Sequence, residues 1–278
     1  MRHDAAEAWA NDEFGDAKLG DERRKSRVVR MAAAALRRPG SNVSGTFGRT
    51  AEAEAAYRLV ENDAVSIDEL ASAAHRATAR RCTSLSSVIV PIDGTSIRVR
   101  DARDLRGLGP LSSLTDKARG IQAMTAIAVA PTGETLGVLG REFWLRAATP
   151  TPPSGFKSSR PREDRESYRW VTMLKATAEC MKASAPACTP WFQLDRGGDC
   201  WMVIEHAITQ GLTLTVRANQ NRLLEQRGTH LFPTIRNSTP IGVLDVDVPA
   251  APTHAARCAR LVVRSLRIRL PIPIRRRH

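Results

Sequence analysis

The first 82 residues show the apolar spacing of amphipathic helices. From Asp21, which fits a helix N-cap, apolar residues recur every three or four positions up to Leu36, and the Arg38-Pro39-Gly40 sequence predicts the end of this helix. Residues 40–48 are predicted to form a polar turn. Further helices are predicted over residues 50–61 and from Ser66, where Ser66 and Glu69 fit a reciprocal capping box. This pattern predicts a helical domain over residues 1–82.

From Ser87 the pattern changes to that of strands. Val88–Ile92 and Ser96–Arg100 are rich in β-branched residues, and Gly94 between them indicates a turn or kink. The later elements are predicted as strands over 121–130 and 135–145, a helix over 163–182, a strand ending at Asp195, a helix over 199–210 and a strand over 212–218. Three meandering strands followed by alternating helices and strands predict a mixed five-stranded sheet of ribonuclease H type, an α/β (α+β) domain over residues 83–222.

The remaining segment, residues 223–278, has weaker signals. Residues 231–240 are loop-like, residues 241–248 are typical of an edge strand, and residues 257–270 alternate between apolar residues and arginine as a half-exposed strand does. The prolines at positions 271 and 273 are incompatible with a paired central strand. We expect this segment to be a β-rich region that is incomplete.

Two aspartates, Asp93 and Asp195, stand at the ends of apolar runs in the strand region. The predicted topology places them on the first and fourth strands, which are neighbours, although they are 102 residues apart in sequence. A carboxylate at the end of a buried strand is held rigidly and faces solvent, as a metal ligand in phosphoryl transfer must be. A turn-capping role is the alternative for each aspartate.

Composition narrows the class of protein. No apolar run approaches the roughly 18 residues of a membrane span, and the N-terminus lacks an apolar signal core, so we expect a cytoplasmic protein without membrane contact. The five cysteines include no Cys-x-x-Cys pair, which predicts reduced, buried thiols and no zinc site. The net charge of +13 indicates a polyanionic partner. After Asp195 there are 13 arginines and five acids, a net charge of +8.

Several short motifs, in their order and spacing, carry a resemblance to a known family. They are Leu19-Gly20-Asp21-Glu22-Arg23-Arg24, Ala55-Ala56-Tyr57-Arg58, Ile92-Asp93-Gly94-Thr95-Ser96, Leu114-Thr115-Asp116-Lys117-Ala118-Arg119-Gly120, Leu136-Gly137-Val138-Leu139 with Trp144, and Leu194-Asp195-Arg196-Gly197-Gly198-Asp199. From about Trp9 to Leu270 the sequence resembles the Tn5-like transposases of the IS4 group.

The resemblance implies a DDE-type cut-and-paste transposase that acts on double-stranded transposon-end DNA in the bacterial cytoplasm, associated with the nucleoid. Such enzymes hold two Mg²⁺ (or Mn²⁺) ions with two aspartates and a glutamate, and Asp93 and Asp195 would be the aspartates. The resemblance also implies that three basic residues contact DNA phosphates near the cleavage site, namely Lys117, Arg119 and Arg196. The N-terminal helix, with Arg23, Arg24 and Arg27, would bind the transposon end mainly through contacts with the DNA backbone.

The chain departs from this family at its third acid, which lies in a Tyr-x-x-Arg-x-x-x-Glu motif. The two tyrosines, Tyr57 and Tyr168, are followed three positions later by Val60 and Val171, so the motif is absent. We therefore expect a C-terminally truncated transposase that is inactive alone. Gly197-Gly198 is expected to loosen the turn beside Asp195.

Two alternatives remain open. The chain could be a non-catalytic DNA-binding fragment that competes or dimerises with full-length transposase. It could also be a self-sufficient nuclease with Glu205, Glu225 or Asp245 as the third ligand.

Overall fold

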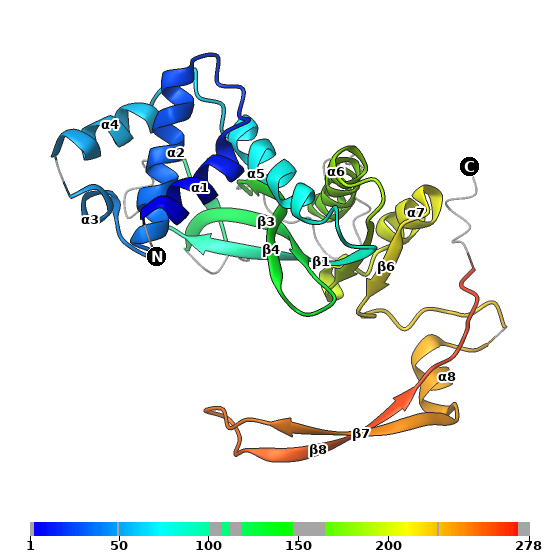
Figure 1. Ribbon diagram of the computed structural model, residues 1–278. Helices are drawn as coiled ribbons and strands as arrows, with labels where there is room; N and C mark the ends of the chain where they lie inside the picture. The colour runs from blue at the N-terminus through cyan, green and yellow to red at the C-terminus, as the bar shows by residue number, and fades with distance from the viewer. Residues whose placement is uncertain are drawn as a thin grey trace. The chain divides into compact units, whose positions relative to one another are not determined.

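The computed structural model describes residues 3–48, 50–100, 107–111, 118–146, 165–226 and 228–271. The chain forms two compact units, residues 1–217 and residues 218–278 (Figure 1). The first unit contains both the N-terminal helices and the main sheet. The finer division into three domains at residues 82 and 222 stays a prediction.

Five helices form the N-terminal part of the first unit. They are α1 (His3–Phe14), α2 (Glu22–Arg37), α3 (Val43–Phe47), α4 (Thr50–Val60) and α5 (Ile67–Arg81). The predicted N-cap of α2 is confirmed, because the Asp21 side chain accepts a hydrogen bond from the Arg23 N–H. The prediction of a turn over residues 40–48 is wrong in part. There the Asn42 side chain caps the short helix α3, which ends at Gly48 with a left-handed φ of 64°.

The capping box at the start of α5 is only half formed. Ser66 Oγ accepts a hydrogen bond from the Glu69 N–H at 3.1 Å, as predicted. Glu69 does not return the bond to Ser66 and instead accepts from the Lys18 N–H at 3.0 Å and from Arg76 Nη2 at 3.1 Å. Glu69 therefore ties α5 to the segment between α1 and α2.

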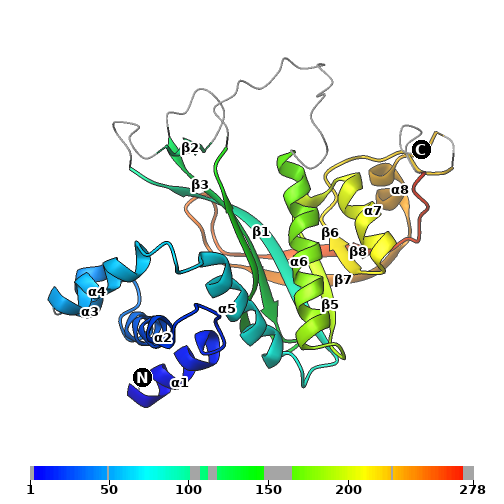
Figure 2. The same ribbon diagram turned by 90° about the horizontal axis from the view of Figure 1, so that it is seen from above.

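Within the residues that the structure describes, the main sheet has six strands. They are β1 (Ser87–Arg98), β2 (Gly109–Pro110), β3 (Arg119–Val129), β4 (Thr135–Trp144), β5 (Thr189–Leu194) and β6 (Thr213–Val216). Strands β2, β3, β1, β5 and β6 lie side by side in this order, and β4 pairs with β3 (Figure 2). The β1–β3 and β3–β4 pairs are antiparallel, and the β1–β5 and β5–β6 pairs are parallel. The predicted mixed sheet is confirmed, with the two-residue strand β2 in addition.

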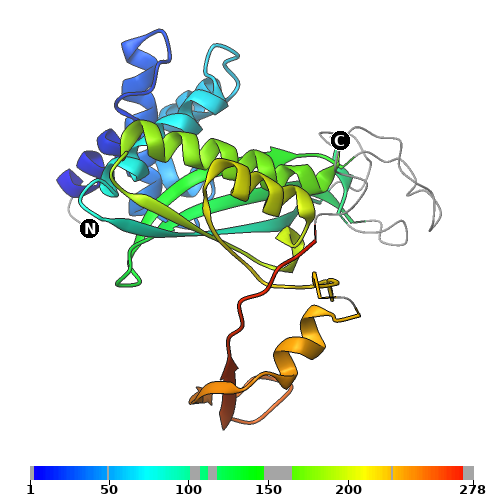
Figure 3. The ribbon, with the colours of Figure 1, turned by 90° about the vertical axis from the view of Figure 1, so that its right-hand side faces the viewer.

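Helices cover one face of this sheet (Figure 3). α6 (Arg169–Ser184) follows the short 3₁₀ turn Glu166–Tyr168 and links β4 to β5, while α7 (Trp201–Gln210) links β5 to β6. The helix predicted over residues 163–182 is confirmed in this segment, and its residues Trp170, Leu174 and Met181 are buried in the core. On β1, Val88, Val90 and Ile92 alternate into the same core. Burial of these side chains contributes to the hydrophobic stabilisation of the sheet.

The second unit consists of α8 (Leu231–Asn237) and the antiparallel hairpin of β7 (Pro240–Val248) and β8 (Arg257–Arg264). The prediction of a loop over residues 231–240 is wrong. Pro233 lies in the first turn of α8, where a backbone N–H has no intrahelical partner to lose. The strand predicted to continue to Leu270 ends at Arg264, because Arg264 pairs with Pro240, the first residue of β7.

The predicted fold class is confirmed, with mixed α/β content, helices at the N-terminus and a mixed sheet.

Candidate active site and nucleic-acid interface

Asp93 lies on β1 at the point where the burial of the strand changes. Residues up to Ile92 alternate with buried positions, and residues 93–98 are all exposed. The prediction that Asp93 ends a strand is wrong, because β1 continues through Gly94, which pairs with Met124 on β3. What ends at Ile92 is the parallel pairing with β5. Asp93 therefore lies where β1 is no longer paired with β5, and its carboxylate is exposed at this edge.

Asp195 follows directly on β5 and caps a 3₁₀ turn over Arg196–Gly198. Ile92 and Leu194 form the last Cα pair between β1 and β5, so Asp93 and Asp195 follow immediately on paired residues. Neighbouring strands lie about 4.8 Å apart. The structure thus brings together the two aspartates that the sequence predicts as partners.

Each carboxylate has one oxygen engaged locally. Asp93 Oδ1 accepts a hydrogen bond from the Gly94 N–H at 2.8 Å, and Asp195 Oδ1 accepts one from the Gly197 N–H at 2.8 Å. Among the described residues, no hydrogen bond or ion pair is formed by either Oδ2 atom. Both side chains are exposed. Two fixed carboxylates with one unoccupied oxygen each can bind a hard cation.

The turn after Asp195 is closely packed, which contradicts the expectation that Gly197-Gly198 loosens it. A Cβ atom added at Gly197 would lie 2.9 Å from Cζ2 of Trp170, and one added at Gly198 would lie 2.8 Å from Cβ and Cδ1 of Leu194. Both contacts are shorter than real Cβ atoms make. Glycine is therefore required because α6 and β5 approach the turn, and this packing fixes the backbone that holds Asp195.

The donor set fits a magnesium or manganese ion. Mg²⁺ is commonly bound by one or two carboxylates, with water and substrate phosphate completing its coordination. Within the described part of the chain, no group of three or more His, Cys, Asp or Glu side chains could hold a metal ion. Of the alternative third ligands, Glu225 lies 3.8 Å from Arg269 and Asp245 lies 3.7 Å from Arg260, whereas Glu205 is exposed on α7.

The basic residues predicted near the cleavage site have different environments. Arg196 is exposed and directly follows Asp195. Arg119 is the first residue of β3, is half-buried, and its Nη1 donates to the Leu108 carbonyl at 3.4 Å. Lys117 lies outside the described residues.

The three arginines predicted to bind DNA at the start of α2 also differ. Arg23 is exposed, and its guanidinium forms no hydrogen bond or ion pair with the residues that the structure describes. Arg24 donates to the Leu19 carbonyl at 3.0 Å, and Arg27 forms a salt bridge of 2.8 Å with Glu52 on α4. Arg24 and Arg27 thus contribute to the packing of the helices.

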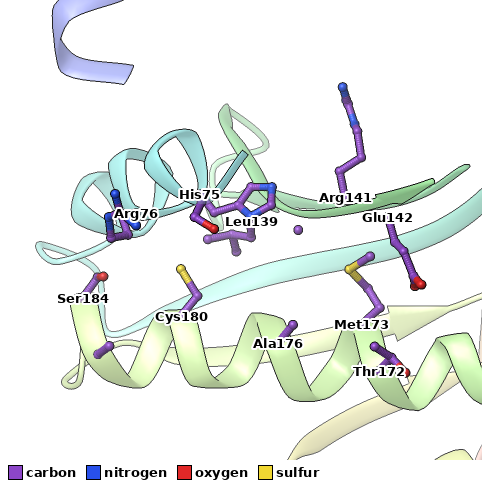
Figure 4. Close-up of a pocket in the computed structure, with 13 residues that line it drawn as sticks. His75, Arg76, Leu139, Arg141, Glu142, Thr172, Met173, Ala176, Cys180 and Ser184 are labelled. Carbon is purple, nitrogen blue, oxygen red and sulfur yellow. The ribbon is translucent and has the colours of Figure 1, made fainter. Parts of the chain in front are cut away.

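A pocket of about 520 Å³ lies between α5, β4 and α6, and no pattern in the sequence indicates it (Figure 4). Small and apolar side chains such as Ala176 and Met173 form much of its lining. Burial, together with the charges of Arg141 and Arg76, lowers the pKa of His75 in this lining to about 4. Burial also raises the pKa of the Cys180 thiol. At neutral pH both groups are uncharged, so neither supplies an imidazolium or a thiolate for chemistry in this pocket.

One comparison with known proteins bears on the N-terminal helices. A protein-family model described as transposase DNA-binding matches residues 6–65, a segment that runs from α1 through α4. The match supports a transposase at this coarse level, with DNA as its partner. Among the helices that the structure describes, none has the length and apolarity that a membrane crossing requires.

Proposed function

We propose that this chain, with a transposase DNA-binding domain at residues 6–65, is a DDE-type cut-and-paste transposase of the Tn5-like IS4 group. Its sheet would be the ribonuclease H-like catalytic core. In this proposal Asp93 and Asp195 are two of the three carboxylates of the active site, and the N-terminal helices bind the transposon end.

One observation carries the proposal, namely the strand register. Asp93 and Asp195 follow the paired residues Ile92 and Leu194 on adjacent parallel strands, and both carboxylates are exposed. An arrangement of two acids at neighbouring strand positions is what a shared metal site needs. The family match lies in a different part of the chain, so it supports the proposal independently.

Asp93 and Asp195 would hold the divalent ions through their Oδ2 atoms, while their Oδ1 atoms keep the hydrogen bonds from the Gly94 and Gly197 N–H groups. When bound, the ions would make a water or a 3′-hydroxyl a better nucleophile and stabilise the leaving oxygen. Arg196 and Arg119, with Lys117, would contact the phosphates that flank the scissile bond and hold the strand in place. The glycine turn beside Trp170 keeps the Asp195 carboxylate in a fixed position.

We further propose that the chain alone does not cleave DNA, because a third carboxylate does not join the aspartate pair within the described residues. The alternative function is that of a non-catalytic DNA-binding protein that competes for ends with full-length transposase or dimerises with it. The two proposals share the DNA-binding domain and differ only in the chemistry of the sheet.

The test combines binding and cleavage on one substrate. A labelled duplex of the terminal repeats that flank the gene, and a scrambled duplex of equal length, are incubated with the wild-type chain and Mn²⁺. We expect preferential binding of the terminal repeat and no nicking. Equal affinity for the two duplexes would refute the recognition of transposon ends.

Variants of the acidic residues test whether the chain itself cleaves DNA. If the wild-type chain nicks DNA, and Asp93→Ala or Asp195→Ala abolishes the nicking while the exposed control Asp247→Ala does not, the proposed inactivity is wrong. Loss of nicking in Glu205→Gln would then identify the third ligand. Addition of the chain to a full-length transposase reaction tests the alternative, which predicts reduced excision without any cleavage by the chain itself.

A further inference from the structure

A hollow of about 430 Å³ lies among the helices of the DNA-binding domain, and its lining is unusually rich in arginine. Four arginines and two glutamates line it, and they come from α1, from α2 and the residue that follows it, and from α4. They are Arg27, Arg30, Arg37, Arg38, Glu7 and Glu52. The charges sum to +2 when all six groups are ionised. The hollow therefore suits an anion.

The helical spacing of α2 produces this lining. Arg27, Arg30, Ala34 and Arg37 follow one another at intervals of three or four residues and so lie on one face of the helix. At 1.5 Å per residue, this face extends about 15 Å from Arg27 to Arg37. Ala34 lies within the stretch and lines the hollow. Its small side chain leaves the space that a longer residue would fill.

Two of the arginines are held in place by the protein itself. Arg27 Nη1 lies 2.8 Å from Glu52 Oε2. Arg38 Nη1 donates to the carbonyls of Gly45 at 2.7 Å and Thr46 at 3.1 Å, which fixes it against α3. These two guanidinium groups are therefore held in fixed positions in the lining of the hollow.

The other two have donor capacity left. Arg37 Nη1 is buried and has no hydrogen-bond partner among the described residues. Its nearest carboxylate oxygen, Glu7 Oε1, lies 4.0 Å away, which is too far for a hydrogen bond. Arg30 is exposed at the hollow and forms no hydrogen bond or ion pair within the part of the chain that the structure describes. A buried guanidinium nitrogen without an acceptor is costly, and an anion would supply that acceptor.

The geometry points to a binding site for a DNA backbone phosphate, in which Arg30 and Arg37 donate to the phosphate oxygens between the ordered groups Arg27 and Arg38. The guanidinium group matches phosphate geometry and can donate two parallel hydrogen bonds. This assignment rests on the proposed DNA-binding function and names residues of the interface that sequence reasoning missed.

A backbone phosphate is favoured over a free anion for two reasons. The hollow lies within residues 6–65, which match the transposase DNA-binding family. The arginine face of α2 also continues to the exposed Arg23, one turn before Arg27, so that phosphates along one strand could be contacted in succession. A site for a single free anion does not require a row of arginines along the helix.

The experiment measures the affinity of the full chain for a labelled terminal-repeat duplex by fluorescence anisotropy at several salt concentrations. We expect Arg30→Ala and Arg37→Ala each to weaken binding about tenfold and to lower the slope of log affinity against log salt by about 1. Ala34→Leu, which fills the hollow without changing any charge, should weaken binding as well. Circular dichroism melting curves confirm that each variant is folded.

The matched control is Arg257→Ala, which removes an exposed arginine of β8 outside residues 6–65 and should leave affinity within about twofold. The inference is overturned if folded Arg30→Ala, Arg37→Ala and Ala34→Leu all bind DNA as the control does. It is also overturned if calorimetry shows that inorganic phosphate binds the hollow while these variants keep their DNA affinity. Failure of the proposed function is a separate result, in which the wild-type chain shows no affinity for DNA.

Discussion

Arg81 joins three elements of the first unit, and its removal allows a quantitative test of the packing. Located at the end of α5, it donates from Nη1 to Asp12 Oδ2 at 2.7 Å and from Nη2 to Glu13 Oε1 at 2.5 Å, both on α1. Its Nε donates to the Leu136 carbonyl on β4 at 2.8 Å. Replacement by methionine keeps most of the side-chain volume and removes all of these bonds.

The two carboxylates make different contributions. The Asp12 side chain is 51% exposed, so its ion pair contributes less than about 1 kcal/mol. The Glu13 side chain is only 8% exposed, and loss of Arg81 would leave it as a buried charge without a partner. Breaking a buried pair in this way costs about 3–5 kcal/mol. We expect Arg81→Met to lower the free energy of unfolding by about 3 kcal/mol, at the lower end because Glu13 can move towards water.

The assay is equilibrium urea unfolding at neutral pH, followed by tryptophan fluorescence. Arg80→Met is the matched control, since Arg80 is 44% exposed and its loss should cost about 1 kcal/mol or less. The double variant Glu13→Gln/Arg81→Met, which has no unpaired buried charge, should recover about 1–2 kcal/mol of the loss. The reasoning is refuted if Arg81→Met costs no more than the control, or if the double variant is as unstable as the sum of its single variants.

Three further predictions concern separate sites. The folded-state pKa of His75, about 4, lies below its ordinary 6.5, so the unfolded chain binds the proton first and stability should fall by about 2 kcal/mol as pH decreases from 7 to 4. His75→Gln should flatten this dependence in urea titrations, and an unchanged slope would contradict it. Gly198→Ala forces a Cβ against Leu194 and should destabilise by about 1–3 kcal/mol, whereas an unchanged melting temperature would mean that the turn can relax. Asp245→Asn should change stability by less than about 0.5 kcal/mol, because its contact with Arg260 is exposed, and a larger loss in chemical denaturation would count against that view.

The parts of the fold that the sequence predicts correctly are those with local or periodic causes. Asp21 and Ser66 cap their helices because a short oxygen-bearing side chain can reach the free N–H groups of the first turn. The buried face of α6 follows from helical spacing alone. The pairing of β1 with β5 follows from the order of elements, because strands joined by a crossover helix are parallel. That order brings Asp93 and Asp195 together.

The errors arise where a residue type has two structural uses. Gly94 was interpreted as a break, yet it occupies an ordinary extended position in β1 because β3 pairs with it. Residues 231–240 are predicted to be a loop, but residues 231–237 form α8, and Pro233 in its first turn removes no hydrogen bond. Gly197 and Gly198 indicated flexibility, whereas Trp170 and Leu194 leave no room for a Cβ. For Gly94 and Gly197 the deciding partners, Met124 on β3 and Trp170 on α6, come from other elements of the fold.

The arginines of the DNA-binding domain illustrate the same limit for function. Composition identifies a basic helix, but it does not distinguish an arginine that binds a carbonyl, such as Arg24, from one that remains available, such as Arg30. Only the folded arrangement shows which guanidinium groups have acceptors. Charge counts therefore predict the class of partner, and hydrogen-bond accounting is needed to predict the contact residues.

The two functions proposed for this chain have different requirements, and only one of them depends on a third carboxylate. Phosphate contacts need only positioned cations, which α2 provides within a helical domain joined to the sheet through Arg81 and its neighbours on α5. Phosphoryl transfer needs a complete set of metal ligands, and the Asp93–Asp195 pair supplies only part of the set that the family resemblance implies. The proposed DNA contacts on α2 do not use the metal ligands of the sheet. Binding of transposon ends should therefore persist when cleavage is absent. A chain with this combination would occupy transposon ends without cutting them, so competition with an active transposase follows from the same structural features that support descent from one.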